Sequence, residues 1–309
     1  MNNLPHSRLA AIAAAGVALT VAASSQVFVM AGSASASTSA STSASTAAVS
    51  RQALPAPAQA VPAPAAVNSA AQSSAALANK SLATANRIYR SGRFADVNCR
   101  PGSLPRGSTA AYKRFLTRVT TCLNNAWSRQ FRKARLPFSK PRLRIVTRKV
   151  NTPCGKWNAG AEAVYCSADR TMYMWISKTQ LRQPFPLGIT RLVAHEYGHH
   201  VQQISKIWSY YWTARARASK SQQLALSRRS ELQAECFSAV FMSTLQGQPD
   251  FTDREWDYTV DWFRKNGAKG WPQNDHGRGP TQANWMTRGF NSGSPAACNT
   301  WKASARATL

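Results

Sequence analysis

The hydrophobic residues of segment 110–135 recur with the spacing of an amphipathic helix. The segment 142–150 instead alternates basic and apolar residues, which predicts a β-strand. The segment 163–177 predicts two further strands, joined by a turn at Ser167-Ala168-Asp169. Apolar residues return to helical spacing over 190–206, over 222–245 and near 253–266. A stretch rich in Gly and Pro, 266–280, overlaps the end of the last of these helices.

The order of these elements, a helix followed by strands and then by further helices, predicts an α+β fold. We expect a small β-sheet packed on the helices of 190–206 and 222–245. The chain shows no internal repeat, and the predicted folded part, 86–309, has the size of one domain.

Two segments precede this predicted domain. Residues 1–36 have the layout of a secretory signal peptide, with an apolar core over 9–30 and a small-residue cleavage site at Ala34-Ser35-Ala36. An uncleaved membrane anchor is the alternative, because about 20 apolar residues can span a bilayer. Residues 37–85 are mainly Ala, Ser, Thr and Pro, which predicts a flexible linker. We therefore expect a secreted, extracellular protein whose linker can hold the domain near the cell envelope.

The six cysteines all lie within 86–309, and an even number in a secreted protein predicts disulfide bonds. No two form a C-x-x-C pair, which argues against a zinc site made of cysteines. Pairing each cysteine with its nearest neighbour in sequence would give Cys99–Cys122, Cys154–Cys166 and Cys236–Cys298. We predict only Cys154–Cys166 from local sequence, because these two residues flank a short, turn-rich stretch.

The chain is strongly basic, with 39 Lys and Arg residues, 12 Asp and Glu residues and a net charge of +27. The segment 87–149 holds 17 Lys and Arg residues and one acidic residue, Asp96. Such a surface attracts polyanions, which include anionic cell-wall polymers. We expect no specific nucleic-acid partner, because no nucleic-acid-binding motif accompanies the charge.

Within this basic chain, the segment 195–199, HEYGH, matches the pattern H-E-x-x-H. On a helix, His195 and His199 lie one turn apart on one face, so their imidazoles can bind one zinc ion. Glu196 follows the first histidine and can act as a general base on a metal-activated water. With five histidines and five glutamates, chance would produce this motif in about one such chain in a thousand. His200 points to another face, and we predict that it is a bystander.

A catalytic zinc needs a third protein ligand and an open position for water. The segment 228–241 places Glu231 and Glu235 one turn apart on a helix, and apolar residues follow them. We predict that Glu231 is the third ligand and that Glu235 accepts a hydrogen bond from a ligand imidazole. The alternative is an exposed helix on which both carboxylates pair with Arg228 and Arg229.

The motifs VAHEYGHHVQ and ELQAECFSAVF resemble those of the bacterial family called "Putative neutral zinc metallopeptidase", which has a gluzincin-type arrangement. The segments 154–175 and 276–290 resemble two further blocks of that family. The resemblance implies a zincin-like fold, zinc held by His195, His199 and Glu231, and Glu196 as the catalytic base. The family usually has Asp where this chain has Glu235, so the carboxylate here is shifted by about one methylene.

His276 lies in the stretch rich in Gly and Pro. We predict that it donates a hydrogen bond to the tetrahedral intermediate of peptide hydrolysis, with Tyr197 as a second candidate for this role. The alternative for His276 is a structural or exposed loop histidine.

Together these features predict a secreted peptidase that uses Zn²⁺ to cleave a peptide or protein substrate. One alternative is a basic module that binds wall polymers or other polyanions and has a structural or inactive zinc site. A zinc amidase that acts on wall peptides is another. Contact with a membrane is expected only if the N-terminal segment stays uncleaved.

Overall fold

The computed structural model describes residues 79–157, 160–248 and 251–309. The predicted signal peptide and the predicted linker up to residue 78 lie outside these residues. Residues 79–84, which we had assigned to the linker, are helical, and Ala83 is fully buried in the main core. The folded part therefore extends to the N-terminal side of the predicted boundary at residue 86. No helix in the described segments is long and apolar enough to cross a membrane.

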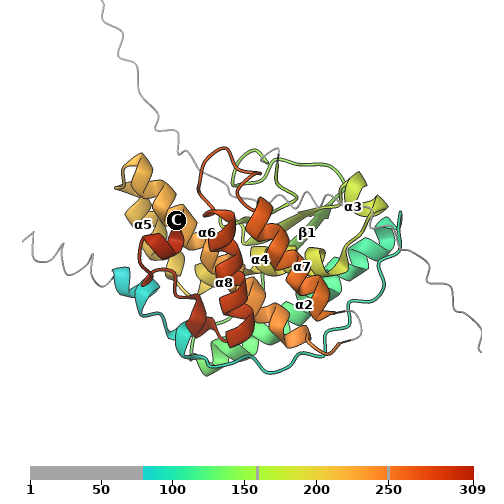
Figure 1. Cartoon of the computed structure of the whole chain (residues 1–309), viewed down its shortest axis with the longest axis horizontal. Coiled ribbons are helices and arrows are strands. Elements are labelled where there is room, and N and C mark those ends of the chain that lie inside the picture. The colour runs from blue at the N-terminus through green and yellow to red at the C-terminus, as the bar shows by residue number, and fades with distance from the viewer. Residues whose placement is uncertain (1–78, 158–159, 249–250) are drawn as a thin grey trace, which may run out of the picture.

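Helices make up most of the described fold (Figure 1). The α-helices are α2 (Thr109–Lys133), α3 (Lys178–Arg182), α4 (Pro186–Ile204), α5 (Ile207–Ala216), α6 (Lys220–Met242), α7 (Asp253–Asn266) and α8 (Gly279–Ser292). The short 3-10 helices are η1 (Arg87–Arg90), η2 (Ser243–Leu245), η3 (Pro295–Cys298) and η4 (Arg306–Thr308).

Three strands form one small sheet in the order β1-β3-β2. The strand β1 (Arg142–Val146) runs parallel to β3 (Thr171–Trp175), and β2 (Ala163–Cys166) runs antiparallel to β3. The β2–β3 hairpin turns close to the predicted position, whereas β1 ends earlier than the predicted strand over 142–150. The α+β architecture is thus confirmed, and it is consistent with the zincin-like fold.

The helices α4 and α6 form the centre of the domain, with α8 packed on α6 (Figure 1). Both contacts depend on glycine. A β-carbon at Gly198 of α4 would lie 2.9 Å from the Cα of Ala234 on α6, which is closer than atoms can pack. A β-carbon at Gly289 of α8 would likewise overlap the backbone carbonyl of Cys236. Since both neighbours are backbone atoms, these helices approach as closely as their main chains allow.

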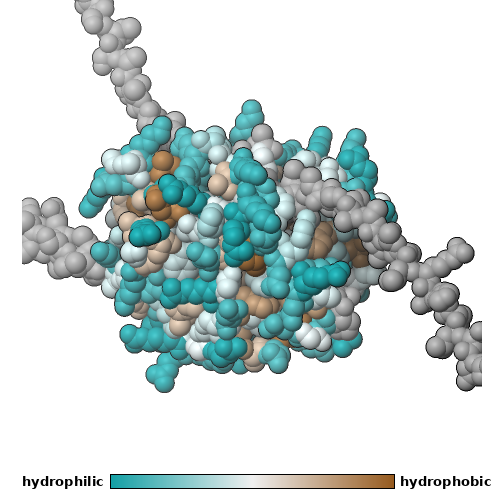
Figure 2. All heavy atoms as spheres, in the orientation of Figure 1, coloured by the Kyte–Doolittle hydropathy of each residue, from teal (hydrophilic) through white to brown (hydrophobic). Residues whose placement is uncertain are grey.

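The helix α2 contacts α6 through aromatic side chains in the main core. Ser108 caps its first turn by accepting a hydrogen bond from the amide of Ala111. Its apolar face lies in the main core, where the fully buried Trp127 packs edge-on against Phe237 of α6, with ring centroids 5.3 Å apart. The opposite face of α2 carries exposed Lys and Arg side chains. The face of the molecule in Figure 2 is likewise mostly hydrophilic, with small hydrophobic patches, one of them beside α5.

Three disulfide bonds brace the fold, and the predicted Cys154–Cys166 bond is one of them. The Cys99–Cys122 bond ties the segment before α2 to that helix, and the Cys236–Cys298 bond ties α6 to η3. The nearest-neighbour pairing of the sequence is therefore the pairing in the structure.

Candidate metal centre

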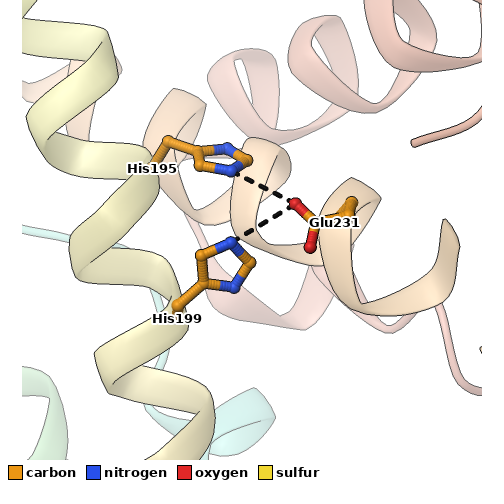
Figure 3. Close-up of side chains that lie close together, drawn as sticks. All are labelled: His195, His199 and Glu231. Atoms are coloured by element: carbon orange, nitrogen blue, oxygen red, sulfur yellow. Dashed lines mark ion pairs between the residues drawn. The ribbon is translucent and has the colours of Figure 1, made fainter. Parts of the chain in front are cut away.

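The helices α4 and α6 bring together His195, His199 and Glu231, as Figure 3 shows. The Nε2 atoms of His195 and His199 each lie 3.3 Å from Oε2 of Glu231. All three residues are buried, and one ligand atom from each lies within 4.8 Å of the other two. The close approach at Gly198 makes this possible, because it draws the α4 face with the histidines against α6.

The atoms at the centre of this group fit a metal ion. His195 Nε2 and Glu231 Oε2 are buried without a hydrogen-bond partner, which is unfavourable for polar atoms shielded from water. Ligand atoms that share a tetrahedral zinc ion at about 2.1 Å lie about 3.4 Å from one another. The 3.3 Å separations match that spacing, and two imidazole nitrogens with one carboxylate oxygen are a donor set typical of zinc.

A second contact orients the His195 imidazole. Its Nδ1 atom lies 3.0 Å from Oε2 of Glu235, so the ring donates to the carboxylate and turns Nε2 towards Glu231. Arg191, one turn before His195 on α4, donates to both carboxylate oxygens of Glu235. The Arg191 side chain is fully buried, and its guanidinium lies 4.2 Å from the ring centroid of Phe263.

His199 is oriented by an uncharged partner. Its Nδ1 atom lies 3.0 Å from Oε1 of Gln202, on the next turn of α4. Gln202 in turn donates to the backbone carbonyl of Ser230, at 2.7 Å, and to Oε1 of Gln233, at 3.1 Å. The orientation of His199 is therefore fixed by the residues of α6 that flank Glu231.

The charges of the group reinforce one another. Burial acts to raise the pKa of Glu231, but the neighbouring His199 and His276 hold it well below its usual range. Burial acts to lower the pKa of His195, but its contacts with Glu231 and Glu235 outweigh burial and raise the pKa to about 9. These contacts favour the protonated form of His195, and a metal ion that binds Nε2 must displace any proton held there.

Glu196 lies on α4 beside the two histidines and is fully buried. Its carboxylate acts electrostatically on His195 and His199, in the direction that favours their protonated forms. The predicted general base is thus part of the same charged cluster as the metal-binding group.

His276 reaches this cluster from the loop before α8. Its Nε2 atom lies 3.5 Å from Oε2 of Glu231, and its Nδ1 atom lies 2.6 Å from Oδ1 of Asp275. The imidazole stacks on Trp271, with ring centroids 3.6 Å apart and an interplanar angle of 11°. Since His276 is 3% exposed, it is not an exposed loop histidine. Tyr197 points elsewhere, because its hydroxyl donates to Asn124 of α2 at 2.8 Å.

The alternative prediction, an exposed helix on which Glu231 and Glu235 pair with the two preceding arginines, is wrong. Glu231 and Glu235 are buried, and the two arginines before them donate to backbone carbonyls instead. Arg228 donates to those of Asn274 and Thr308, and Arg229 to those of Thr300 and Ala303. Arg228 thereby fixes the loop that carries His276.

His200 takes no part in the metal-binding group. Its Nδ1 atom lies 3.0 Å from the hydroxyl of Tyr165, and its Nε2 atom lies 2.7 Å from the carbonyl of Ser139. Burial is the main cause that lowers the pKa of His200 to about 4, so the ring is neutral at physiological pH. It links α4 to the sheet and to the loop before β1.

Two histidines one turn apart on α4, a glutamate from α6 and a small sheet beside them define the zincin-like class of metallopeptidases. The chain belongs to the family described as "Putative neutral zinc metallopeptidase", whose model matches residues 99–301.

Similar chains are known from several bacteria. The uncharacterized protein YpfJ of Escherichia coli K12 is 29% identical over 203 residues, which cover 61% of this chain and 71% of YpfJ. The uncharacterized protein Rv2575 of Mycobacterium tuberculosis H37Rv is 27% identical over 195 residues, which cover 54% of this chain and 64% of that protein. No solved structure matches the chain.

Proposed function

We propose that this protein is a zinc-dependent peptidase in which His195, His199 and Glu231 hold the ion and Glu196 is the general base. The observation that carries the proposal is the convergence of three buried ligand atoms beside Glu196, on the same helix as the two histidines. Membership of a zinc metallopeptidase family supports the same reaction class.

The side chains of the cluster can perform each proton transfer of peptide hydrolysis. Zinc, when bound, supplies a Lewis acid that polarises the scissile carbonyl and makes water more acidic. Glu196 takes a proton from the attacking water as the new C–O bond forms, and returns it to the amine as the C–N bond breaks. His276, held by Asp275 through Nδ1, donates from Nε2 to the oxyanion of the intermediate.

We also propose that the protein acts outside the cell. The signal-like layout of residues 1–36 and three disulfide bonds support this location, because disulfides persist in oxidising compartments. A basic module that adheres to anionic wall polymers is the second candidate function, favoured by the net charge of +27.

Metal analysis combined with a peptidase assay tests the proposal. We expect the purified protein to hold one zinc ion per chain and to cleave peptides in a reaction that a chelator stops and added zinc restores. Glu196→Gln should keep the zinc and the fold but abolish hydrolysis, whereas Glu231→Ala should release the zinc. Glu255→Gln, on α7 and away from the cluster, is the matched control and should change neither property.

Full hydrolysis by the Glu196→Gln variant would refute the proposed general base. Zinc that stays bound but supports no hydrolysis of any peptide would favour the adhesion module.

A further inference from the structure

A cavity of about 500 Å³ lies where α4 ends and α5 begins. The loop before β1 and the β2–β3 turn complete its wall. This volume is in the range of sites that bind small ligands or short peptide segments. Its aromatic side chains are Phe138, Trp208 and Trp212, and its charged side chains are Arg170 and Lys206. Among the described residues that line it, none is acidic.

The cavity shares a wall with the candidate metal centre. The Trp208 ring lies against the His199 imidazole, with ring centroids 5.4 Å apart, and its Nε1 donates to Ser230, the residue before Glu231. Gln203, which also lines the cavity, lies one turn after His199 on α4. Trp208 and the turn of α4 that carries Gln203 thus lie between the cavity and the metal-binding group.

The floor of the cavity is held in place by hydrogen bonds between its walls. Gln203 donates to the carbonyl of Ser167 in the β2–β3 turn, at 3.0 Å, and accepts from the Tyr165 hydroxyl, at 2.8 Å. The His200 contact with Ser139 joins the loop before β1 to the same helix. These hydrogen bonds hold the walls of the cavity in place, which reduces the entropy lost when a ligand binds.

Both cations of the cavity occupy unusual backbone positions. Arg170 has φ of 55° and Lys206 has φ of 70°. Residues other than Gly rarely adopt this left-handed region of backbone conformation. The third such residue in the described part of the chain, Arg135, does not line the cavity. Asp169, the acid nearest to Arg170 in sequence, accepts hydrogen bonds from the Tyr173 hydroxyl and the Thr171 amide on β3.

We propose that this cavity is a substrate subsite that binds a carboxylate of the peptide close to the scissile bond. Arg170 and Lys206 pair with the carboxylate, and the aromatic walls cover the apolar atoms beside it. The carboxylate belongs to an acidic side chain or to the C-terminus of the peptide. The proposal rests on the proposed peptidase function, and the net charge of +27 would also draw acidic peptides towards the protein.

Matched peptide pairs test the subsite. Internally quenched, alanine-rich peptides with one Glu or one Gln at successive positions around the cleavage site test the side chain. Peptides that end in a free carboxylate or an amide test the C-terminus. We expect the zinc-loaded protein to cleave the charged member of one pair with a kcat/KM about tenfold higher, as a charge-assisted contact provides.

The variants Arg170→Asn and Lys206→Asn should each reduce this preference, and the double variant should abolish it while still cleaving the neutral peptide. Asparagine is chosen because it tolerates the left-handed backbone. Arg135→Asn is the matched control, since it removes a cation with φ of 53° outside the cavity. Cleavage without any charge preference, or a preference that survives in the double variant, would overturn the subsite but not the peptidase.

Binding of the same peptides provides a readout that does not need catalysis. Calorimetric titration of zinc-loaded Glu196→Gln protein should show about tenfold tighter binding of the charged peptide, and loss of this difference when Arg170 and Lys206 are both replaced. That result upholds the subsite even if the unmodified protein cleaves nothing. Equal affinities for charged and neutral peptides would refute it.

Discussion

Arg191 and Glu235 form a buried ion pair with two hydrogen bonds, Nε to Oε1 at 3.0 Å and Nη2 to Oε2 at 2.8 Å. The same Oε2 atom lies 3.0 Å from Nδ1 of His195. Glu235 therefore connects a guanidinium and a candidate metal ligand that lie one turn apart on α4. Its side chain makes both contacts.

Replacing Arg191 with Met should leave the Glu235 carboxylate buried without its main cationic partner. We expect the free energy of unfolding to fall by about 3–5 kcal/mol, because an uncompensated buried charge is strongly unfavourable. Zinc affinity should fall by about 10–100-fold, since the His195 ring loses a fixed partner. Urea unfolding and competition with a chromophoric chelator measure the two effects. The control variant Arg191→Lys keeps the charge, so it should lower stability and zinc affinity less than the Met variant does. Unchanged zinc affinity in the Met variant would show that Arg191 has no role at the site.

The Glu235→Asp variant shortens this side chain by one methylene. We expect it to bind zinc more weakly, by about tenfold, because the shorter side chain cannot keep its contacts with both Arg191 and His195 at their present distances. The same chelator competition measures this affinity, with Glu255→Asp as the control. Zinc binding as tight as that of the unmodified protein would mean that the helices adjust to the shorter side chain.

Replacing Gly198 with Ala should separate α4 from α6. The added β-carbon would lie 2.9 Å from the Cα of Ala234, a backbone atom that cannot rotate away. We expect a loss of about 1–3 kcal/mol in unfolding free energy from overpacking, together with weaker zinc binding. Thermal unfolding and metal titration check both effects. Gly270→Ala is the control, because a β-carbon there would meet nothing within 4 Å.

Glu162 should make the stability of the fold depend on pH. Burial is the main cause that raises the pKa of this carboxyl from 4.5 to about 7, and its contacts with Ser177 and Gln180 offset only part of that effect. The folded chain therefore binds more protons than the unfolded chain between these pH values. The contribution of Glu162 to the free energy of unfolding should accordingly fall as pH rises from 4.5 to 7.

The Glu162→Gln variant lacks the carboxyl group that titrates at this position. We expect the metal-free variant to be more stable than the metal-free unmodified protein by about 1–3 kcal/mol at pH 8, and nearly equal to it at pH 4.5. Denaturant unfolding across this range gives the difference directly. A constant difference at all pH values would show that Glu162 does not titrate in this window.

The sequence predicted the parts of the site that depend on local spacing. His195 and His199 share a helical face because they are one turn apart, and Glu231 and Glu235 follow the same rule on α6. Arg191 was missed, although it lies one turn before His195, because nothing in a single sequence shows that its partner is Glu235, 44 residues later. Asp275 was missed for a different reason, since it lies in an irregular loop without a periodic pattern.

The helices α3, α5 and α8 were also missed. Gly279 and Pro280 lie in a stretch that reads as loop, yet they begin α8, because proline at the first turn of a helix gives up no hydrogen bond. Pro186 begins α4 in the same way, four residues before the predicted start at residue 190. Two residues, Ser205 and the left-handed Lys206, separate α5 from α4, and the aromatic side chains of α5 did not by themselves indicate a helix.

The disulfide bond between Cys236 and Cys298 ties the metal-binding segment of α6 to η3. Cys236 directly follows Glu235 on α6, and its partner lies 62 residues later in η3. A chain whose thiols are still reduced must hold the ligand-bearing face of α6 in place by packing and hydrogen bonds alone. The disulfide bond removes conformational freedom from the unfolded ensemble, so we expect a reduced chain to be less stable and therefore to bind zinc more weakly.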